Sequence, residues 1–300
     1  MRSIALYIAK ALCHYQLTRE SIKKYNITMK IHHLNCGTMC PICQKLMSGQ
    51  GSYFKPAKLI CHVLLIEHKN KLVLVDTGYG LKDIAQPKTR LGGLFLKLTR
   101  PKLDPQETAI EQIKALGFSP SDVSDIVPTH LDLDHIGGAT DFPNARIHVY
   151  AKELDYALKP TLKDRLRFRK AQLQDISTWQ RHANINAQWF GFDAIDLTEQ
   201  LGFEVKMIPL IGHTLGHVGI AVKSENKWLL HCGDAYFHPS QITQNPQMPI
   251  GLAIFEKQVQ TNQAQRIATQ EKLRALHLAH PEIAMFCAHD PSELERYQSR

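Results

Sequence analysis

The six residues from His130 to His135 constrain this chain more than any other stretch. They read His-Leu-Asp-Leu-Asp-His and are followed by glycines at positions 137 and 138. Two imidazoles and two carboxylates in one short run are ligand types that borderline and hard divalent metals accept. The run therefore predicts a metal site on a loop that follows the short apolar strand at 125–127.

Four further segments carry ligand-type residues where a predicted strand meets a loop. They are the Asp-Thr-Gly turn at 76–78, the Gly-His-Thr-Leu-Gly-His segment at 212–217, the Cys-Gly-Asp turn at 232–234 and the Ala-His-Asp turn at 288–290. Functional residues concentrate on such loops. Together the segments make a chance cluster at 130–135 much less plausible than a metal centre.

The hydrophobic pattern predicts an α/β layered domain. Apolar or alternating runs predict strands at 29–34, 58–67, 71–76, 125–127, 145–150, 203–211, 217–224, 227–232 and 283–288. Helices are predicted from Asp104 to Gly117, with a proline at the first helical position, and from about 261 to 278. The charged stretch at about 152–200, with leucines and Ile176 at helical spacing, predicts a helical insertion.

Length and composition indicate one globular unit. The chain has 300 residues, 44% of them hydrophobic, and no apolar run approaches the ~18 residues of a membrane span. Residues 1–28 lack a signal-peptide pattern, because Lys10 interrupts their apolar stretch, and we expect a poorly ordered extension or a weakly packed amphipathic helix. The domain proper is expected at 29–300.

The cysteines and the charges bear on compartment and partners. Seven scattered cysteines suit reduced thiols in the cytoplasm better than a disulfide framework. The net charge of +8 is spread out except at Lys159–Lys170, which we interpret as a solvated helix face and not as a nucleic-acid patch, because no aromatic residues interleave with it. We expect a small-molecule substrate and neither nucleic acid nor membrane as partner; the oligomeric state, with a homodimer as one option, is left open.

In this order the motifs resemble those of the metallo-β-lactamase superfamily, over roughly residues 29–290. The resemblance implies an αββα sandwich, in which two mixed β-sheets pack face to face with helices outside. It also implies two divalent metal ions, zinc by default with iron or manganese as alternatives, and hydrolysis by a metal-bridging hydroxide. By position, it assigns His130, Asp132 and His217 to one ion, Asp134, His135 and His289 to the other, and Asp234 to both.

The same resemblance assigns roles around the ions. Asp134 is expected to pass a proton to the leaving group as well as to bind metal. His213 is expected to be structural, because the later histidine of its segment is taken as the ligand. Asp76 is expected to brace the loops without touching metal, and His32, His33, His62, His148 and His231 are expected to be satisfied histidines inside strands.

Asp132 departs from the family pattern, which usually has a histidine at this position. A carboxylate there adds negative charge and favours a harder metal such as manganese or iron. Flavo-diiron proteins of the superfamily also carry a carboxylate at this position, so a di-iron oxidoreductase is kept as an alternative function.

Among members of the superfamily, the chain is most similar to the N-acyl homoserine lactonases in length and motif spacing. These have a catalytic tyrosine three residues after the bridging aspartate, where this chain has Phe237, so the neighbouring Tyr236 is the catalytic candidate. The resemblance implies a lactone or ester substrate, with a phosphodiesterase or nuclease as the alternative. Four aromatic residues of the predicted insertion would cover an acyl group: Trp179, Trp189, Phe190 and Phe192.

The spacing Cys36-x3-Cys40-x2-Cys43 is also the one that radical-SAM enzymes use for a four-iron cluster. A hairpin and not a repeating βα pattern follows it. We interpret these cysteines as structural or adventitious, with a small metal clip as the alternative.

Overall fold

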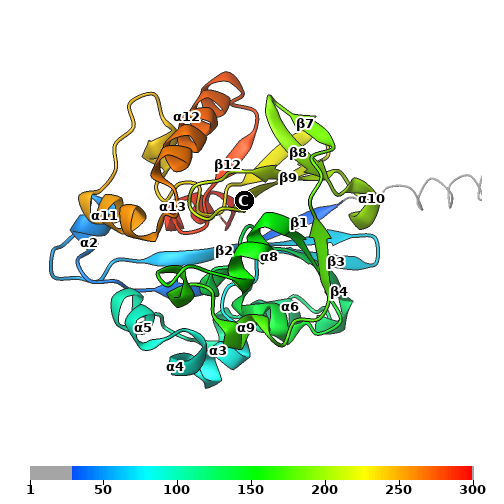
Figure 1. Cartoon of the computed structure of the whole chain (residues 1–300), viewed down its shortest axis with the longest axis horizontal. Helices are drawn as coiled ribbons and strands as arrows, with labels where there is room; N and C mark the ends of the chain where they lie inside the picture. The colour runs from blue at the N-terminus through cyan, green and yellow to red at the C-terminus, as the bar shows by residue number, and fades with distance from the viewer. Residues whose placement is uncertain (1–28, 299–300) are drawn as a thin grey trace, which may run out of the picture.

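The computed structural model describes residues 29–298, so the expectation for residues 1–28 lies outside the described residues. Two six-stranded sheets form the centre of the molecule (Figure 1). The first sheet has the order β1-β2-β3-β4-β5-β6. Its strands are β1 (Lys30–Met39), β2 (Leu59–His68), β3 (Lys71–Val75), β4 (Val123–Val127), β5 (Arg146–Tyr150) and β6 (Trp179–His182).

The second sheet has the order β12-β11-β10-β9-β8-β7. Its strands are β7 (Ala187–Trp189), β8 (Phe192–Asp196), β9 (Val205–Pro209), β10 (Val218–Ser224), β11 (Lys227–His231) and β12 (Ala284–Phe286). Both sheets are mixed: β3 to β6 pair in parallel beside an antiparallel β1-β2-β3 edge, and only β12 is parallel to its neighbour in the second sheet.

Helices and short 3-10 turns connect the strands. The helices are α2 (Gln44–Ser48), α3 (Leu81–Ala85), α4 (Pro87–Arg90), α5 (Gly93–Thr99), α6 (Ala109–Ala115), α7 (Leu133–Ile136), α8 (Ala151–Leu158), α9 (Lys170–Leu173), α10 (Thr198–Leu201), α11 (Ile250–Val259), α12 (Gln263–Ala279) and α13 (Pro291–Gln298). The 3-10 turns are η1 (Pro105–Glu107), η2 (Pro120–Asp122), η3 (Gly137–Asp141), η4 (Asp164–Leu166) and η5 (Pro239–Ile242).

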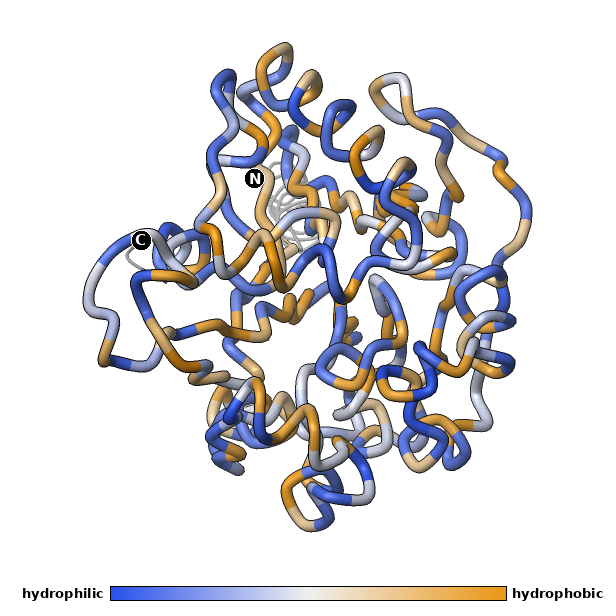
Figure 2. Tube along the Cα trace, turned by 60° about the vertical axis from the view of Figure 1, so that its left-hand side comes forward, coloured by the Kyte–Doolittle hydropathy of each residue, from blue (hydrophilic) through white to orange (hydrophobic). Residues whose placement is uncertain are grey.

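Three buried clusters account for the layering. The middle cluster joins the facing sides of the two sheets, for example Val73 of β3 with Met207 of β9. A second cluster packs α6, α8 and α9 on the outer face of the first sheet, and a third packs α12 on the outer face of the second. Hydrophobic and hydrophilic segments are interspersed along the trace (Figure 2), while β2 and β3 are buried over nearly their whole length because both faces of their sheet are covered. The predicted αββα sandwich is confirmed.

The predicted hairpins are confirmed, at β2-β3 and at β10-β11, because a polar turn separates two apolar runs in each. The predicted helix from Asp104 is interrupted: the proline begins η1, and α6 starts only after Thr108, whose extended backbone separates the two.

The prediction of a helical insertion at about 152–200 is wrong in its second half. Helices occupy the first part, as α8, η4 and α9, but β6, β7 and β8 follow. Trp179 and Trp189 belong to these strands, where aromatic side chains fit a half-buried pleated surface. Within residues 29–298, no helix is both long and apolar enough to cross a membrane.

Candidate metal centre

The loops after several strands converge at one edge of the two sheets. The loop after β4 leads into α7 with the His130–His135 run, and the loop after β9 carries segment 212–217. The turns after β11 and β12 carry Asp234 and His289. Strands that are far apart in sequence therefore deliver the predicted ligand types to one place.

The first group of ligand atoms comes from His130, Asp132, His213 and Asp234, all buried. The Nε2 atoms of His130 and His213 lie 3.3 and 3.0 Å from Oδ2 of Asp132. Oδ2 of Asp234 lies 3.4 Å from His213 Nε2 and 3.9 Å from His130 Nε2. Four ligands about 2.1 Å from one tetrahedral ion are roughly 3.4 Å apart, so these spacings fit one divalent cation.

The second group lies on the other side of Asp234. Oδ1 of Asp234 is 3.3 Å from His135 Nε2 and 3.1 Å from His289 Nε2. Oδ2 of Asp134 lies 3.7 Å from His289 Nε2, and the thiol of Cys61 adjoins this pair. Asp234 thus lies between the two groups: its Oδ2 faces His213 of the first group, and both of its oxygens lie near His289 Nε2 of the second, at 3.1 and 3.2 Å.

Hydrogen bonds behind the histidines aim their Nε2 atoms at the cluster. The Nδ1 atoms of His130, His135 and His289 bind Thr129 Oγ1 at 3.0 Å, Asp76 Oδ2 at 2.9 Å and the carbonyl of Ile60 at 2.6 Å. Such partners fix the tautomer of metal-binding histidines. His130 Nε2 and Asp234 Oδ1 are buried without a hydrogen-bond partner, an arrangement that a bound cation explains.

The protonation of the histidines reflects the negative charge gathered here. Burial and the neighbouring His135 lower the pKa of His130 to about 4, so its Nε2 lone pair is free at neutral pH. Burial opposes protonation of His135 too, but the carboxylates of Asp234 and Asp76 outweigh it and raise its pKa well above the usual value. A divalent cation would neutralise this excess of carboxylate charge.

Asp76 braces the loops, as expected. Its backbone is left-handed, with φ 59°, which a non-glycine residue adopts only under constraint. Its carboxylate accepts hydrogen bonds from the backbone N–H of Thr129 at 2.7 Å and from His135. Burial favours the neutral acid, but His135 holds the pKa of Asp76 below its usual value.

The structure places His213, and not His217, in the first group of ligand atoms. Both ring nitrogens of His217 are already engaged: Nδ1 with the carbonyl of Leu210 at 3.0 Å, and Nε2 with the backbone N–H of Asp234 at 2.9 Å. His213 instead turns its Nε2 toward the two carboxylates of the first group. The earlier histidine of the segment therefore takes the place expected for the later one.

Tyr236, the catalytic candidate, belongs to neither group of ligand atoms. Its side chain is fully buried in the cluster beneath α12, and its hydroxyl binds both carboxylate oxygens of Glu293 at 3.2 Å. Phe237 is the neighbour that faces the centre: its ring stacks on His289, with centroids 5.6 Å apart, and meets the ring of Phe255 of α11 edge-on.

Two residues that the sequence did not single out hold the centre together. Arg167, just after η4, binds the carboxylate of Asp132 through Nε at 2.6 Å and through Nη2. Burial favours the neutral acid, but Arg167 holds the pKa of Asp132 well below its usual range. Glu153 of α8 accepts hydrogen bonds from Leu131 N at 3.0 Å and from Thr214 Oγ1 at 2.6 Å, which ties the two ligand loops to one helix.

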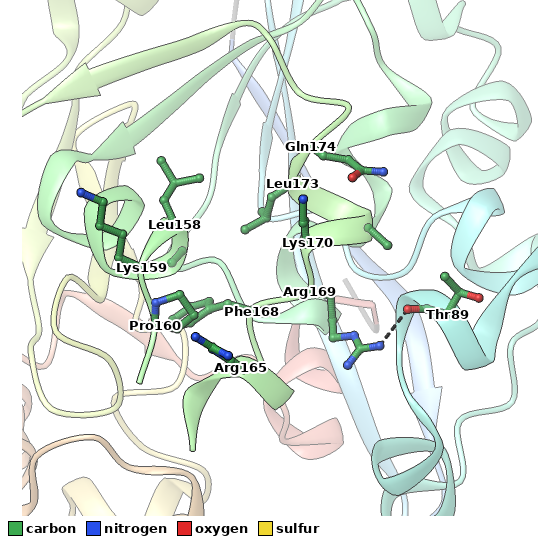
Figure 3. Close-up of a pocket in the computed structure, with 12 residues that line it drawn as sticks. Thr89, Leu158, Lys159, Pro160, Arg165, Phe168, Arg169, Lys170, Leu173 and Gln174 are labelled. Atoms are coloured by element: carbon green, nitrogen blue, oxygen red, sulfur yellow. Dashed lines mark hydrogen bonds between the residues drawn. The ribbon is translucent and has the colours of Figure 1, made fainter. Parts of the chain in front are cut away.

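The stretch Lys159–Lys170 is not one solvated helix face. It forms η4 and the start of α9 with the turns between them, and it borders a cavity of about 960 Å³ (Figure 3). Arg165 and Arg169 line this cavity around Phe168, and no residue of the two ligand groups does so. Arg167 alone in the stretch reaches the metal centre.

The aromatic residues expected to cover an acyl group pack elsewhere. Trp189 is buried against Trp228 and Phe190, on the second sheet, and Trp179 packs on the core of the first sheet. None of Cys36, Cys40 and Cys43 joins a group of three or more metal-ligand atoms among residues 29–298. Cys36 is buried in β1.

Comparisons with known proteins agree with this geometry. The sequence model of the metallo-beta-lactamase superfamily matches residues 57–289 of this chain. A probable metallo-hydrolase of Mycobacterium tuberculosis is 40% identical over 265 residues, which are 88% of this chain and 81% of the relative. The N-acyl homoserine lactonase AttM of Rhizobium radiobacter is 33% identical over 134 residues, 44% of this chain and 49% of the lactonase.

Solved structures show the same fold at lower identity. An N-acyl homoserine lactone hydrolase with the product N-hexanoyl-L-homoserine bound at its catalytic metal centre superposes with a TM-score of 0.62 at 20% identity, over 91% of this chain and 96% of that one. AidC, a dizinc quorum-quenching lactonase, has a TM-score of 0.58 at 18% identity, over 88% of each chain.

Proposed function

Because this chain belongs to the metallo-beta-lactamase superfamily, we propose that its buried centre binds two divalent metal ions and hydrolyses a lactone or ester. The observation that carries the proposal is the position of Asp234, whose carboxylate lies between the two ligand groups and contacts histidines of both. His130, Asp132 and His213 would hold one ion, and Asp134, His135 and His289 the other.

When bound, two such ions polarise a carbonyl oxygen and lower the pKa of a water molecule toward ~7, with zinc as the default metal. The protein's own part is to hold the histidine Nε2 atoms in place through Thr129, Asp76 and Ile60. Asp134 would also carry a proton to the leaving group. Burial raises the pKa of this carboxyl, which suits a group that accepts and releases a proton.

The surroundings of the centre favour an apolar acyl substrate. Phe237 stacks on His289 and Phe255 packs on Phe237, and the exposed side of α11 carries Ile250 and Ile254, which are 64% and 59% exposed. The lactonase AttM is a relative over less than half of this chain, and a structural neighbour holds N-hexanoyl-L-homoserine at its metal centre. These features support an N-acyl homoserine lactone or a similar ester.

The two alternative functions lose support. A di-iron oxidoreductase rested on the extra negative charge of Asp132, which Arg167 neutralises. A phosphodiesterase rested on the basic stretch, whose exposed cations Arg165 and Lys170 line a cavity that includes no metal-ligand residue.

The test is a substrate panel with zinc-loaded protein. It comprises N-acyl homoserine lactones with acyl chains of about four to twelve carbons, an aryl acetate and a bis-aryl phosphodiester. We expect lactone or ester turnover that rises with acyl length. Turnover of the phosphodiester alone, or of none of these substrates at full metal loading, would overturn the proposal.

A further inference from the structure

Arg167 uses all five of its N–H donors within the metal centre. Nε and Nη2 bind the two oxygens of Asp132, and Nη2 also contacts His213 Nε2. Nη1 donates to the backbone carbonyls of His213 at 3.1 Å and of Val259 at 2.5 Å. A guanidinium has five N–H groups, so none remains to bind a substrate.

These bonds join three separate segments at one cation. Asp132 belongs to the loop before α7, His213 to the loop after β9, and Val259 ends α11. The side chain of Arg167 is only 13% exposed. A planar, forked guanidinium with its donors satisfied is a rigid element, so it fixes the positions of both ligands that it touches.

The cation does not fill the ligand group. His130 Nε2 has no hydrogen-bond partner, although it lies 3.3 Å from the same Asp132 oxygen that Nη2 contacts. Arg167 Nη2 thus contacts two of the four ligand residues, Asp132 and His213, and leaves His130 Nε2 unpaired.

The positive charge of Arg167 changes the net charge of the first ligand group. With neutral histidines, the first ligand group carries a charge of −2 from Asp132 and Asp234, and Arg167 reduces it to −1. A fixed positive charge a few ångströms from a divalent ion opposes binding of that ion, and it offsets the cost of burying Asp132 when the ion is absent.

We propose that Arg167 is a built-in counter-cation of the first metal site, which lowers the affinity of that site for a divalent ion because its charge neutralises Asp132. The second ligand group has no such partner: among residues 29–298, the carboxylates of Asp134 and Asp234 form ion pairs with histidines and with no lysine or arginine. The inference rests on the two-ion centre proposed above, and not on the substrate.

A charge cycle tests it, by titration of the apoprotein with Zn²⁺ against a chromophoric chelator. Arg167→Gln should raise the first-site affinity at least tenfold, because Asp132 loses its counter-charge. Asp132→Asn should lower it at least tenfold, because the cation is left unpaired. The double variant should lie within about fivefold of wild type, since neutral partners again face each other.

Two further variants separate the effect of the charge of Arg167 from the effect of its hydrogen-bonding geometry. Arg165→Gln removes an exposed cation from the same segment and should leave both affinities unchanged. Arg167→Lys keeps the charge without the fork, and its first-site affinity should stay within about fivefold of wild type even if Arg167→Gln does not fold.

Loss of the first ion in Arg167→Lys, or a lower affinity in Arg167→Gln, would show that the fork and not the charge matters and would overturn the inference. A wild-type protein that binds fewer than two ions would instead contradict the two-ion centre itself, whatever the variants do.

Discussion

The Nε2 atom of His217 lies 2.9 Å from the backbone nitrogen of Asp234, and His217 belongs to neither group of ligand atoms. His213 faces the carboxylates instead. We therefore expect His213→Ala to lose one of the two bound ions, whereas His217→Ala keeps both and loses about 1–3 kcal/mol of stability, because it leaves the buried Leu210 carbonyl and Asp234 N–H unpaired.

Metal content after dialysis and the urea dependence of unfolding distinguish the two variants. Two ions in His213→Ala beside one ion in His217→Ala would restore the later histidine as the ligand.

Tyr236→Phe tests whether the tyrosine next to Phe237 takes part in catalysis. Its hydroxyl is bound to Glu293 inside the core, so its removal should cost roughly 1 kcal/mol of stability. The kcat and KM for the preferred lactone should stay within about twofold of wild type. A tenfold fall in kcat with unchanged metal content would mean that the hydroxyl reaches the substrate.

Asp76→Asn tests the support behind His135. The aspartate accepts from His135 Nδ1 at 2.9 Å, and loss of such a partner typically lowers metal affinity about 10- to 100-fold. Asp125→Asn is the matched control, because Asp125 is equally buried and binds His148 at 2.8 Å inside the first sheet. It should lose stability and keep its metal affinity; equal losses of affinity in the two variants would refute the assigned role of Asp76.

The buried carboxyl of Glu293 should make the stability of the fold depend on pH. Burial raises the pKa of this carboxyl from 4.5 to about 7. The native state therefore binds the proton more tightly than the unfolded chain, so the stabilisation is complete below about pH 4.5 and is lost as the pH rises through 7. Between pH 5 and pH 8, the free energy of unfolding of the wild type should fall by about 1–3 kcal/mol more than that of Glu293→Gln, whose side chain does not titrate. A rise in the free energy of unfolding of the wild type relative to Glu293→Gln over this range would contradict the prediction.

Six of the seven ligands that the resemblance assigned lie in the groups of ligand atoms, because the loops that carry them follow strands whose ends meet at one edge of the two sheets. The seventh failed because two histidines in segment 212–217 are equivalent by type. Which one faces the centre depends on the backbone path, which packs Gly216 so tightly on Glu153 that a Cβ there would lie 2.1 Å from the Glu153 nitrogen.

Arg167 and Glu153 escaped prediction for a different reason. In the sequence, Arg167 is one cation of a basic stretch and has the same type as Arg165 and Arg169. Only the fold shows that its side chain is buried against Asp132, 35 residues away. The edge strands β6 and β7 were likewise hidden, because short strands with polar residues lack a clear two-residue period.

The central claim is a two-ion hydrolytic centre organised around Asp234. The most direct measurement follows N-hexanoyl homoserine lactone hydrolysis while Zn²⁺ is added stepwise to the apoprotein, with bound metal counted at each point. The account predicts no hydrolysis without metal, saturation at two ions per chain, and full activity only with the second ion. Hydrolysis by the metal-free protein, or saturation at one ion with full activity, would contradict it.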